Sequence, residues 1–436
     1  MPYKPGRKPR RSSRKVHRRV EAAVERTLHI STLGRHGDGI ATADGDGEQD
    51  RYFVPFALPG ERVRAKTVGK RAEVLEILEP SSDRVEPFCP HFGSCGGCTS
   101  QHLGDAPYRA WKHGIVEMAL SNKGLEVSVD DLIEAHGEGR RRVTFHVRFS
   151  KGRVQVGFMQ SRSRDLIDLE RCPILVPELD AAPETARLMT APFASKTQQL
   201  DIAITATREG LDCDIRGVGA VDYDIHVALA ERAEACDIAR VSIEGEMALE
   251  RRKPMLRVGK LRVPLPPASF LQATAIGEEA LARLIQSEVG DAKKVADLFC
   301  GVGPFALRLA PSVAVYAADS NEAAIAALRE AVRYGEGLRP VEAEVRDLFR
   351  DPVYHDDLKH FDAVVFNPGR AGAEAQVKEI AVSTVPLVVC VSCDPASLAR
   401  DAKILTDGGY QFERVTPVDQ FKYSPHIESV AVFRRK

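Results

Sequence analysis

The sequence predicts an α/β protein in three parts, of which the last is a doubly wound, mostly parallel sheet. Two patterns predict this fold class. From about residue 270, short apolar runs alternate with helical patterns, which is typical of β-α-β units. Residues 20–82 instead hold five short strand patterns divided by glycine-rich turns, which favour a small β-barrel of the OB type. Residues 83–267, between them, begin with a Cys- and Gly-rich segment and mix helix and strand patterns as an α+β domain does.

Composition excludes several classes of protein. Apolar residues make up 44% of the 436 residues and charged residues 28%, as expected of a globular protein. The chain contains no run of 18 or more apolar residues that would span a membrane. The basic N-terminus lacks the apolar stretch of a secretory signal, so we expect a cytoplasmic protein. In that compartment the nine cysteines favour metal ligands, catalytic thiols or core residues over disulfides.

Residues 1–19 form a segment of strongly basic composition. They hold nine of the 61 Lys and Arg residues and no acid, which leaves 52 basic against 62 acidic residues in the rest of the chain. We expect a disordered basic tail that attracts the phosphate backbone of a nucleic acid. A solvated tail without a specific partner is the alternative, because charge runs alone discriminate poorly between partners.

Local patterns predict the individual elements. The expected barrel strands are Val24–Ile30, Gly39–Ala43, Arg51–Val54, Arg62–Val68 and Arg71–Leu78. The middle part is expected to contain a helix over 106–122, strands Arg142–Phe149 and Arg153–Met159, and a helix near Glu178–Met189. The expected strands of the last part are Val295–Phe299, Val313–Ala318, Phe361–Phe366, Leu387–Ser392, Tyr410–Thr416 and Glu428–Phe433. Its helices begin near Pro304 and cover Glu322–Tyr334 and Pro395–Thr406.

A glycine loop follows the first strand of the last part. In Asp297-Leu-Phe-Cys-Gly301-Val-Gly303 the glycines let the backbone pass close to a ligand. Asp319 ends the next strand about 20 residues on, where a carboxylate holds ribose hydroxyls. The loop has only the G-x-G part of the G-x-G-x-x-G pattern that binds a pyrophosphate. A nucleoside without phosphates, such as S-adenosylmethionine, therefore fits the loop better. An ordinary tight turn is the alternative.

Two further strands end in polar groups at the same rim of the sheet. Asn367, in the sequence Asn-Pro-Gly-Arg, follows the fourth strand and can present its amide to a nucleobase or a cofactor. An ordinary turn at the end of a strand is the alternative, because the same residues are common in turns. Cys393 follows the fifth strand, immediately before a helix that begins at Pro395. A thiol near a helix N-terminus is expected to have a lowered pKa and to be a better nucleophile. A redox pair with Cys390 is disfavoured, because Cys390 lies inside an apolar strand.

Glu428 begins the last strand, in the sequence His-Ile-Glu. A carboxylate at this place can serve as a general base. A salt-bridged surface glutamate is the commoner fate of any single Glu and is the alternative.

Four cysteines are candidates for a metal site. Cys89, Cys95 and Cys98 are closely spaced, and Cys172 lies far downstream. Zinc and a 4Fe-4S cluster both accept four thiolates, so the spacing leaves the metal open. Four thiolates would close the site, which predicts a structural role. Unrelated cysteines are the alternative, chiefly for Cys172.

Taken together, these motifs resemble the RNA uracil-5 methyltransferases, which make 5-methyluridine, over nearly the whole chain. The sequence Ser269-Phe-Leu-Gln272 resembles the F-x-Q motif of that family, and the stretches around Gly301, Cys393 and Glu428 resemble its cofactor, nucleophile and base motifs. The resemblance implies a TRAM domain over 20–82, a central domain with a 4Fe-4S site over 83–267, and a Rossmann-like S-adenosylmethionine-dependent domain over 268–436. This layout is closer to the branch acting on 23S rRNA than to the tRNA branch.

The resemblance also implies a role for particular residues. Cys393 would attack a uridine of the RNA substrate covalently, and Glu428 would accept the proton from carbon 5. No obligate protein partner is implied. The cofactor and base site would be lined by Gln272, Phe299, Gly301, Asp319, Asp347 and Asn367. The 4Fe-4S cluster would be held by Cys89, Cys95, Cys98 and Cys172.

Three positions depart from the family pattern, and they bear on cofactor affinity more than on the chemistry. Asn367 stands where the family usually has Asp, Pro304 where it commonly has Asn, and Asp319 where it has Glu. Two alternatives therefore stay open: a tRNA uridine-5 methyltransferase, and a non-catalytic RNA-binding Fe-S protein. A cytosine-5 methyltransferase is disfavoured, because the motif at Asn367 lacks the second cysteine of that class.

Overall fold

The computed structural model describes residues 22–43, 51–150 and 152–435. The expected basic tail, residues 1–19, lies outside the described residues. The chain folds into two compact units that divide near residue 82.

The first unit is a closed barrel with the strand order β1-β2-β3-β5-β4. Its strands are β1 (Val24–Leu33), β2 (Gly39–Ala43), β3 (Tyr52–Val54), β4 (Arg62–Val68) and β5 (Arg71–Glu79). Apolar residues alternate along the strands, so that Leu28 and its cross-strand partner Val63 are both fully buried in the interior. The prediction of five strands forming a small barrel is confirmed.

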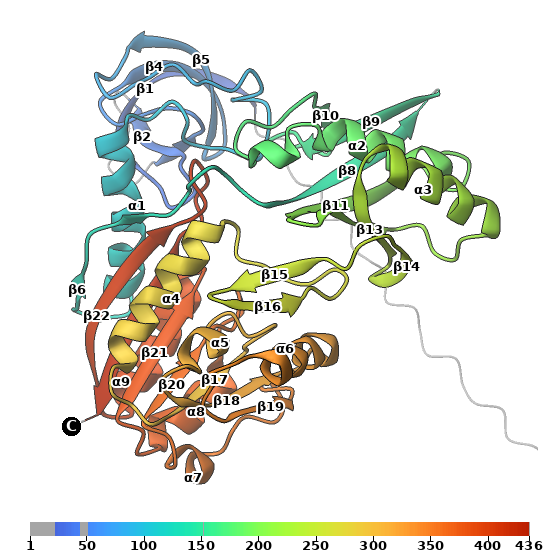
Figure 1. The fold of residues 1–436 in the computed structure, drawn as a ribbon. Coiled ribbons are helices and arrows are strands. Elements are labelled where there is room, and N and C mark those ends of the chain that lie inside the picture. The colour runs from blue at the N-terminus through green and yellow to red at the C-terminus, as the bar shows by residue number, and fades with distance from the viewer. Residues whose placement is uncertain (1–21, 44–50, 151, 436) are drawn as a thin grey trace, which may run out of the picture. The chain divides into compact units, whose positions relative to one another are not determined.

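The middle of the chain forms a seven-stranded sheet with two helices on one face (Figure 1). The strand order is β10-β9-β8-β11-β12-β13-β14. The strands are β8 (Arg142–Ser150), β9 (Arg153–Met159), β10 (Leu166–Asp168), β11 (Gln199–Thr207), β12 (Gly210–Arg216), β13 (Ile238–Ile243) and β14 (Glu246–Glu250). Helices α2 (Ala182–Thr190) and α3 (Tyr223–Ala235) cover the sheet, and short 3-10 turns at Pro177–Leu179 and Ala191–Phe193 flank α2. Phe145, Met189 and Phe193 are fully buried in the core between these layers.

The last part is a nine-stranded sheet with helices on both faces. The order is β19-β18-β17-β20-β21-β23-β22-β6, and β7 also pairs with β22. Its C-terminal strands are β17 (Lys294–Leu298), β18 (Ala314–Asp319), β19 (Val341–Val345), β20 (Ala363–Phe366), β21 (Leu387–Ser392), β22 (Tyr410–Asp419) and β23 (Glu428–Arg435). Strands β17 to β21 run parallel, and β23 runs antiparallel to β21. The expected mostly parallel sheet is therefore observed.

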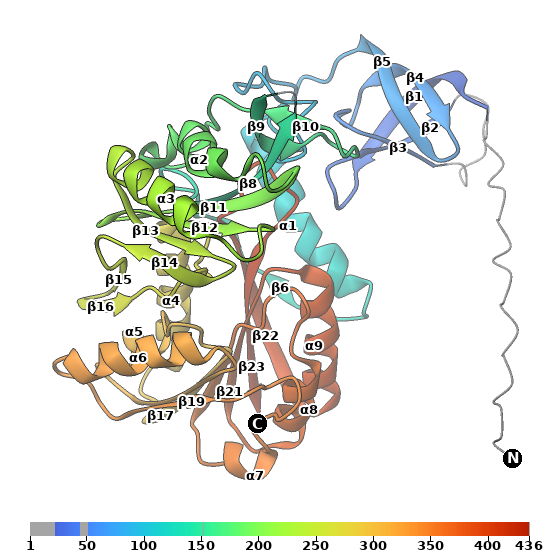
Figure 2. The same cartoon turned by 90° about the vertical axis from the view of Figure 1, so that its right-hand side faces the viewer.

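Figure 2 shows this sheet from its edge, with α4, α5 and α6 on one face and α1, α8 and α9 on the other. The helices are α1 (Asp105–Ser121), α4 (Ala275–Val289), α5 (Ala306–Leu309), α6 (Glu322–Tyr334), α7 (His355–Leu358), α8 (Glu374–Val382) and α9 (Pro395–Asp407). A two-stranded hairpin, β15 (Met255–Val258) and β16 (Leu261–Pro264), packs beside α6. None of the helices in the described ranges is long and apolar enough to cross a membrane.

One segment from the middle of the chain belongs to the last sheet. Helix α1 packs on α9 and β22, and the short strands β6 (Ser128–Val129) and β7 (Ile133–Glu134) pair with β22. Trp111, Ile115 and Val116 of α1 become buried there. These elements lie within the expected central part, residues 83–267. In the structure they pack with the sheet of the last part, because the apolar face of α1 is buried against it.

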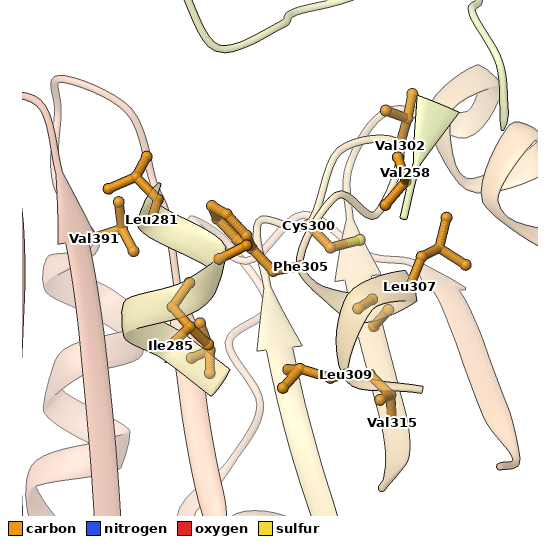
Figure 3. Close-up of a cluster of buried hydrophobic side chains, with 14 of the residues drawn as sticks. Val258, Leu281, Ile285, Cys300, Val302, Phe305, Leu307, Leu309, Val315 and Val391 are labelled. Carbon is orange, nitrogen blue, oxygen red and sulfur yellow. The ribbon is translucent and has the colours of Figure 1, made fainter. Parts of the chain in front are cut away.

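A buried apolar cluster holds the glycine loop after β17 (Figure 3). Cys300 and Val302, on either side of Gly301, are both 4% exposed and point into this cluster. Gly303 has φ +80°, and a Cβ there would meet Leu328 of α6 at 2.6 Å. The loop therefore needs glycine at this position for both its backbone angle and its packing.

Candidate functional site

Cys393 and Glu428 lie at the carboxyl end of β21, beside the last pair of its ladder with β23. Ser392 pairs with Ser429 in this antiparallel ladder. Cys393 comes directly after Ser392, and Glu428 comes directly before Ser429. The two side chains are close enough for the Glu428 carboxylate to raise the pKa of the Cys393 thiol. The structure thus brings together the expected nucleophile and the expected base.

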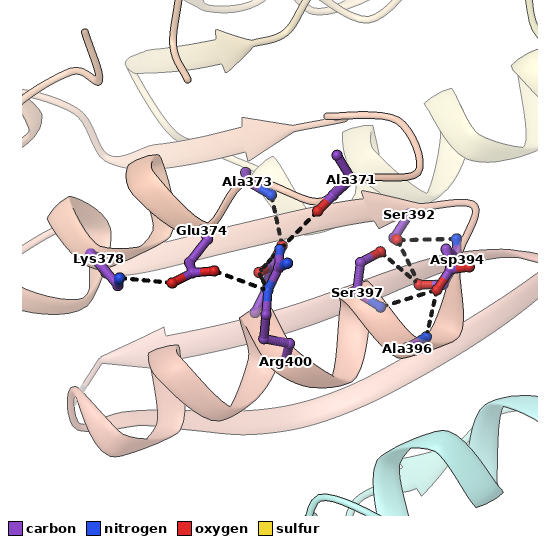
Figure 4. A network of polar contacts seen from close by, with 10 residues as sticks. Ala371, Ala373, Glu374, Lys378, Ser392, Asp394, Ala396, Ser397 and Arg400 are labelled. Atoms are coloured by element: carbon purple, nitrogen blue, oxygen red, sulfur yellow. Dashed lines mark hydrogen bonds and ion pairs between the residues drawn. The ribbon is translucent and has the colours of Figure 1, made fainter. Parts of the chain in front are cut away.

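The surroundings of Cys393 contradict the expected pKa of its thiol. Burial, and then the neighbouring Glu428 carboxylate, raise the pKa of Cys393 to about 11, while Arg370 lowers it. The prediction of a lowered pKa is wrong chiefly because the thiol is buried, and because Asp394 caps helix α9 in its place. Its Oδ1 accepts hydrogen bonds from the backbone N–H groups of Ala396 at 2.8 Å and Ser397 at 3.1 Å (Figure 4). A carboxylate, not the thiol, therefore occupies the helix N-terminus.

Helix α9 also holds the loop that carries Asn367. Arg400 donates to the carbonyl oxygen of Ala371 at 3.0 Å, and Asp401 accepts from the backbone N–H of Ala373 at 2.8 Å (Figure 4). A Cβ at Gly372 would meet the Arg400 Nη2 at 2.3 Å, so only glycine lets the loop approach the helix this closely.

Glu428 is a buried carboxylate. It is 3% exposed, and its Oε1 accepts a hydrogen bond from the Nε2 of Gln420 at 3.1 Å. Its Oε2 is buried and has no hydrogen-bond partner among the described residues. Burial raises the pKa of Glu428 to about 7, against the lowering effect of the Gln420 hydrogen bond. A carboxylate that titrates near neutrality and has one free oxygen is suited to accept a proton.

Gln272, the last residue of the F-x-Q motif, joins the same network. Its Oε1 accepts from the Nε2 of Gln420 at 2.7 Å, and it is 3% exposed. Phe270, two residues earlier, is 73% exposed. The structure therefore links the amide of Gln272 to Glu428 through Gln420 and leaves the ring of Phe270 open to solvent.

Sequence analysis missed Lys112, which fixes the loop before Glu428. Lys112 is fully buried on α1, and its Nζ donates to the Oδ1 of Asp419 at 2.9 Å and to the carbonyl oxygen of His426. The Tyr108 hydroxyl donates to the other oxygen of Asp419. The signal in the sequence is a lysine on the apolar face of a predicted helix, beside Trp111.

His426 is a neutral side chain at the same rim. Burial, and then Arg370, lower the pKa of His426 to about 4. Its Nε2 lies 2.9 Å from the Nη2 of Arg370, which is a donor. The neutral imidazole therefore accepts a hydrogen bond from Arg370 and holds this arginine near Cys393.

The expected cofactor residues lie along the neighbouring strand ends. Asp319, at the end of β18, accepts from the backbone N–H of Gly301 at 2.9 Å and of Asn321 at 2.8 Å. The backbone N–H of Asn367, after β20, donates to the carbonyl oxygen of Leu298 at the end of β17 at 3.2 Å. Because β17, β18, β20 and β21 are parallel, these groups share one edge of the sheet with Cys393.

Two aromatic rings flank the glycine loop. The ring centroids of Phe299 and Phe349 are 5.1 Å apart, and Phe349 is 51% exposed. Asp347, after β19, accepts from the backbone N–H of Phe349 at 3.1 Å and so shapes the turn that presents this ring. Sequence analysis named Phe299 and Asp347 but not Phe349.

The four candidate metal-binding cysteines line a single cavity together with Phe92, Phe158 and Ile174. Burial, with the other thiols as neighbours, raises the pKa of Cys98 to about 11 and of Cys172 to about 12. All four thiols are free of disulfides. Within residues 22–43, 51–150 and 152–435, no group of three or more His, Cys, Asp or Glu residues forms a site for a metal ion.

The fold of the chain is shared with a solved methyltransferase structure. The chain superposes on the crystal structure of Pyrococcus abyssi tRNA (uracil-54, C5)-methyltransferase in complex with S-adenosyl-L-homocysteine with a TM-score of 0.71. The two are 24% identical, and the match covers 93% of this chain and 99% of the other. The family profile described as tRNA (Uracil-5-)-methyltransferase matches residues 265–436.

Relatives extend the match to nearly the whole chain. An RNA methyltransferase of Brucella suis is 45% identical over 408 residues, which is 94% of this chain and 97% of the relative. The 23S rRNA (uracil(1939)-C(5))-methyltransferase of Bordetella parapertussis is 33% identical and covers 93% of this chain and 92% of its own. The chain therefore belongs to the RNA (uracil-5-)-methyltransferase family, and the prediction of an enzyme of this class is confirmed.

Proposed function

We propose that the protein methylates carbon 5 of one uridine in 23S rRNA, with Cys393 as covalent nucleophile and Glu428 as proton acceptor. The observation that carries the proposal is that these two residues flank the last printed pair of the β21–β23 ladder, Ser392 with Ser429, and that the Glu428 carboxylate acts on the Cys393 thiol. The rRNA substrate is favoured by the 33% identical relative from Bordetella parapertussis. A tRNA substrate is the second candidate, because the structural neighbour from Pyrococcus abyssi acts on tRNA.

The chemistry follows from the weak nucleophilicity of carbon 5 of uracil. After the thiol gives its proton to water, the Cys393 sulfur bonds to carbon 6, and the ring becomes an enolate with raised electron density at carbon 5. Bound S-adenosylmethionine would supply the electrophilic methyl group to carbon 5, with cleavage of its bond between sulfur and methyl and release of S-adenosyl-L-homocysteine. Glu428 then removes the proton from carbon 5, and the electrons of that bond expel the Cys393 sulfur from carbon 6. The base must leave its stack to reach these groups, so the uridine is in an unpaired region.

The residues at the strand ends fit S-adenosylmethionine. The backbone at Gly301 is open, since a Cβ there would meet nothing within 4 Å. Asp319 lies beside it and can accept from ribose hydroxyls, while Phe299 and the exposed Phe349 offer apolar faces to an adenine ring. Asn367 adds an uncharged amide at the next strand end.

We propose that the four-cysteine cavity holds a 4Fe-4S cluster, because four thiols from two distant segments line it and such clusters are bound by four thiolates. Cys89, Cys95, Cys98 and Cys172 would hold the cluster, and it would join the loop after the barrel to the central sheet. Visible absorbance of anaerobically purified protein tests this assignment, and a colourless protein with bound zinc would contradict it.

We further propose that the closed barrel is a TRAM domain that contacts RNA. Its strand β4 carries the half-buried Arg62 and the exposed Arg64, although both form ion pairs with glutamates. Phosphate contacts would lower the salt tolerance of binding rather than set sequence preference.

Mass-spectrometric mapping of 5-methyluridine in rRNA and tRNA, with and without the gene, tests the function. We expect one uridine of 23S rRNA to lose its methyl group on deletion, and Cys393→Ala to fail to restore it. Loss from tRNA alone would move the substrate to the second candidate. Titration with S-adenosylmethionine tests the non-catalytic alternative, which would gain support from a complete lack of binding.

A further inference from the structure

A fully buried glutamine connects the base to the F-x-Q motif. Gln420 lies just after β22 and is 0% exposed. Its Nε2 donates to the Oε1 of Glu428 at 3.1 Å and to the Oε1 of Gln272 at 2.7 Å. The two hydrogens of one amide group thus serve two acceptors in the site.

The orientation of this amide follows from a third contact. The Oε1 of Gln420 accepts a hydrogen bond from the backbone N–H of Thr274 at 3.4 Å. Because a backbone N–H can only donate, it requires the oxygen of the amide on that side and directs the NH2 group to Glu428. Gln420 therefore faces the base as a donor.

Helix α4 leaves room for Gln420 at its first turn. Gly277 lies in that turn, and a Cβ there would meet the Oγ1 of Thr274 at 2.7 Å and the Cβ and the Oε1 of Gln420, each at 2.8 Å. The turn begins at Thr274, whose side chain caps the helix. A side chain at position 277 would therefore disturb the Thr274 cap as well as the position of Gln420.

We propose that Gln420 is a positioning residue for the proton-abstraction step: it holds one carboxylate oxygen of Glu428 as an acceptor and leaves the other oxygen for the proton on carbon 5. This inference rests on the function proposed above. A hydrogen bond from a neutral donor stabilises the ionised form of a carboxyl group. In a site that excludes water from Glu428, this donor keeps the carboxylate available near neutral pH.

Other titratable groups surround the base, and none of them replaces this donor. Cys390 and Cys393 face Glu428 from β21, and both sense its charge. His426 precedes it on the same segment and is bound to Arg370. The charge of Asp419, at the end of β22, is paired with that of Lys112 from α1. Gln420 is the group whose hydrogen bond lowers the pKa of Glu428.

Substitution by methionine, which is unbranched and similar in length but cannot donate, tests the inference. For Gln420→Met we expect the acidic limb of the single-turnover rate to move up by about one to two pH units, because one hydrogen bond to a charged group is lost. At pH 7 the rate should fall about tenfold or more and recover above about pH 9. The covalent protein–RNA species should accumulate at pH 7, because the carbon 5 proton is removed slowly.

Gln376→Met is the matched control. Gln376 is also fully buried, and it bonds the backbone of Val353 at 2.7 and 2.9 Å, away from the base. The Gln376→Met variant should be less stable, but the acidic limb of its single-turnover rate should stay at the same pH. Gly277→Ala is the second variant, because it displaces Gln420 and leaves the amide present. It should move the limb in the same direction, so the inference stays testable if Gln420→Met does not fold.

The outcomes separate this inference from the proposed function. If the unmodified enzyme makes 5-methyluridine and both Gln420→Met and Gly277→Ala keep its pH limb, Gln420 has no such role and the function stands. If the unmodified enzyme makes no 5-methyluridine on rRNA or tRNA, the function fails first. A shifted limb in Gln376→Met equal to that of Gln420→Met would also overturn the inference.

Discussion

Cys393 and Glu428 are both weak acids, and burial raises the pKa of each, to about 11 for the thiol and about 7 for the carboxyl group. Ionisation of either group raises the free energy needed to ionise the other, because the two like charges would lie in the same buried site. The resting enzyme therefore keeps the thiol protonated at neutral pH. The positive charge of the nearby Arg370 lowers the pKa of Cys393 and so favours the thiolate.

The raised pKa of Glu428 predicts a pH-dependent cost in stability. The folded protein holds the proton up to about pH 7, whereas an ordinary glutamate loses it near 4.5. Between these values the folded state binds more protons than the unfolded chain, so stability falls as the pH rises through this range. We expect Glu428→Gln to be inactive, but more stable than the unmodified protein at pH 8 by on the order of 3 kcal/mol.

Urea unfolding at pH 8 and at pH 4.5 checks this expectation. The stabilisation should be absent at pH 4.5, where the buried carboxyl group of Glu428 is protonated and carries no charge, as the amide of the variant does. Glu117→Gln, on the exposed side of α1, is the control and should change stability little at either pH. An equal difference at both pH values would show that the carboxylate charge is not the cause.

At the scale of elements, helix α1 and the loop from β22 to β23 are joined by a buried ion pair. For Lys112→Met we expect a loss of about 3–5 kcal/mol, because Asp419 would keep a buried charge without its partner. The turnover number should also fall, since Lys112 holds the carbonyl of His426, two residues before Glu428. Urea unfolding and steady-state kinetics measure both effects.

Lys123→Met, at the exposed end of the same helix segment, is the control for this prediction. It removes the same charge and should leave both quantities near their original values. Unchanged turnover in a folded Lys112→Met protein would contradict the account of the loop.

The glycine loop gives a second prediction for an element. Gly303→Ala should destabilise the protein and weaken binding of S-adenosylmethionine, because its Cβ would meet Leu328 at 2.6 Å and φ is +80°. Gly337→Ala has a similar φ of +70° but meets nothing within 4 Å. Thermal unfolding should therefore show a larger loss for Gly303→Ala. Equal losses would mean that the contact with Leu328 adds nothing beyond backbone strain.

At the scale of the whole molecule, local patterns predicted most of the fold. Strands β2, β4, β9 and β21 and helix α6 have the expected bounds, because their apolar periods are regular and their ends carry turn or cap residues. Strand β19 (Val341–Val345) was not predicted, since glutamates alternate along this edge strand. The attachment of α1 to the C-terminal sheet was not predicted either, because it depends on residues more than 300 positions apart, such as Lys112 and Asp419.

The sequence predicts which of the candidate residues meet at one edge of the sheet, and it does not predict the surroundings of each side chain. The order of the strands brings Cys393, Glu428 and Gly301 to one edge, and a parallel sheet with known connections predicts this. The pKa of Cys393 was predicted with the wrong sign, because the thiol is buried, the Glu428 carboxylate lies near it, and Asp394 caps helix α9 in its place. The burial and the neighbouring carboxylate depend on the tertiary structure and cannot be derived from the motif alone.

The four-cysteine cavity joins two distant parts of the second unit, and this gives a further prediction. Cys172→Ala should abolish visible absorbance and lower the unfolding temperature, because one of four proposed ligands is lost. Cys213→Ala is the control: Cys213 is equally a buried free cysteine of the central sheet, but it lies outside the cavity. It should keep the absorbance. A loss of absorbance in both variants would point to unfolding instead of ligation.

Mass spectrometry of denatured enzyme after reaction with RNA containing 5-fluorouridine tests the covalent mechanism most directly. Fluorine on carbon 5 cannot leave as a proton, so the bond between Cys393 and carbon 6 should not break. With S-adenosylmethionine present, we predict one adduct that carries one added methyl group, on the peptide containing Cys393. Methylation of ordinary uridine without such an adduct, or with the adduct on another residue, would contradict the account.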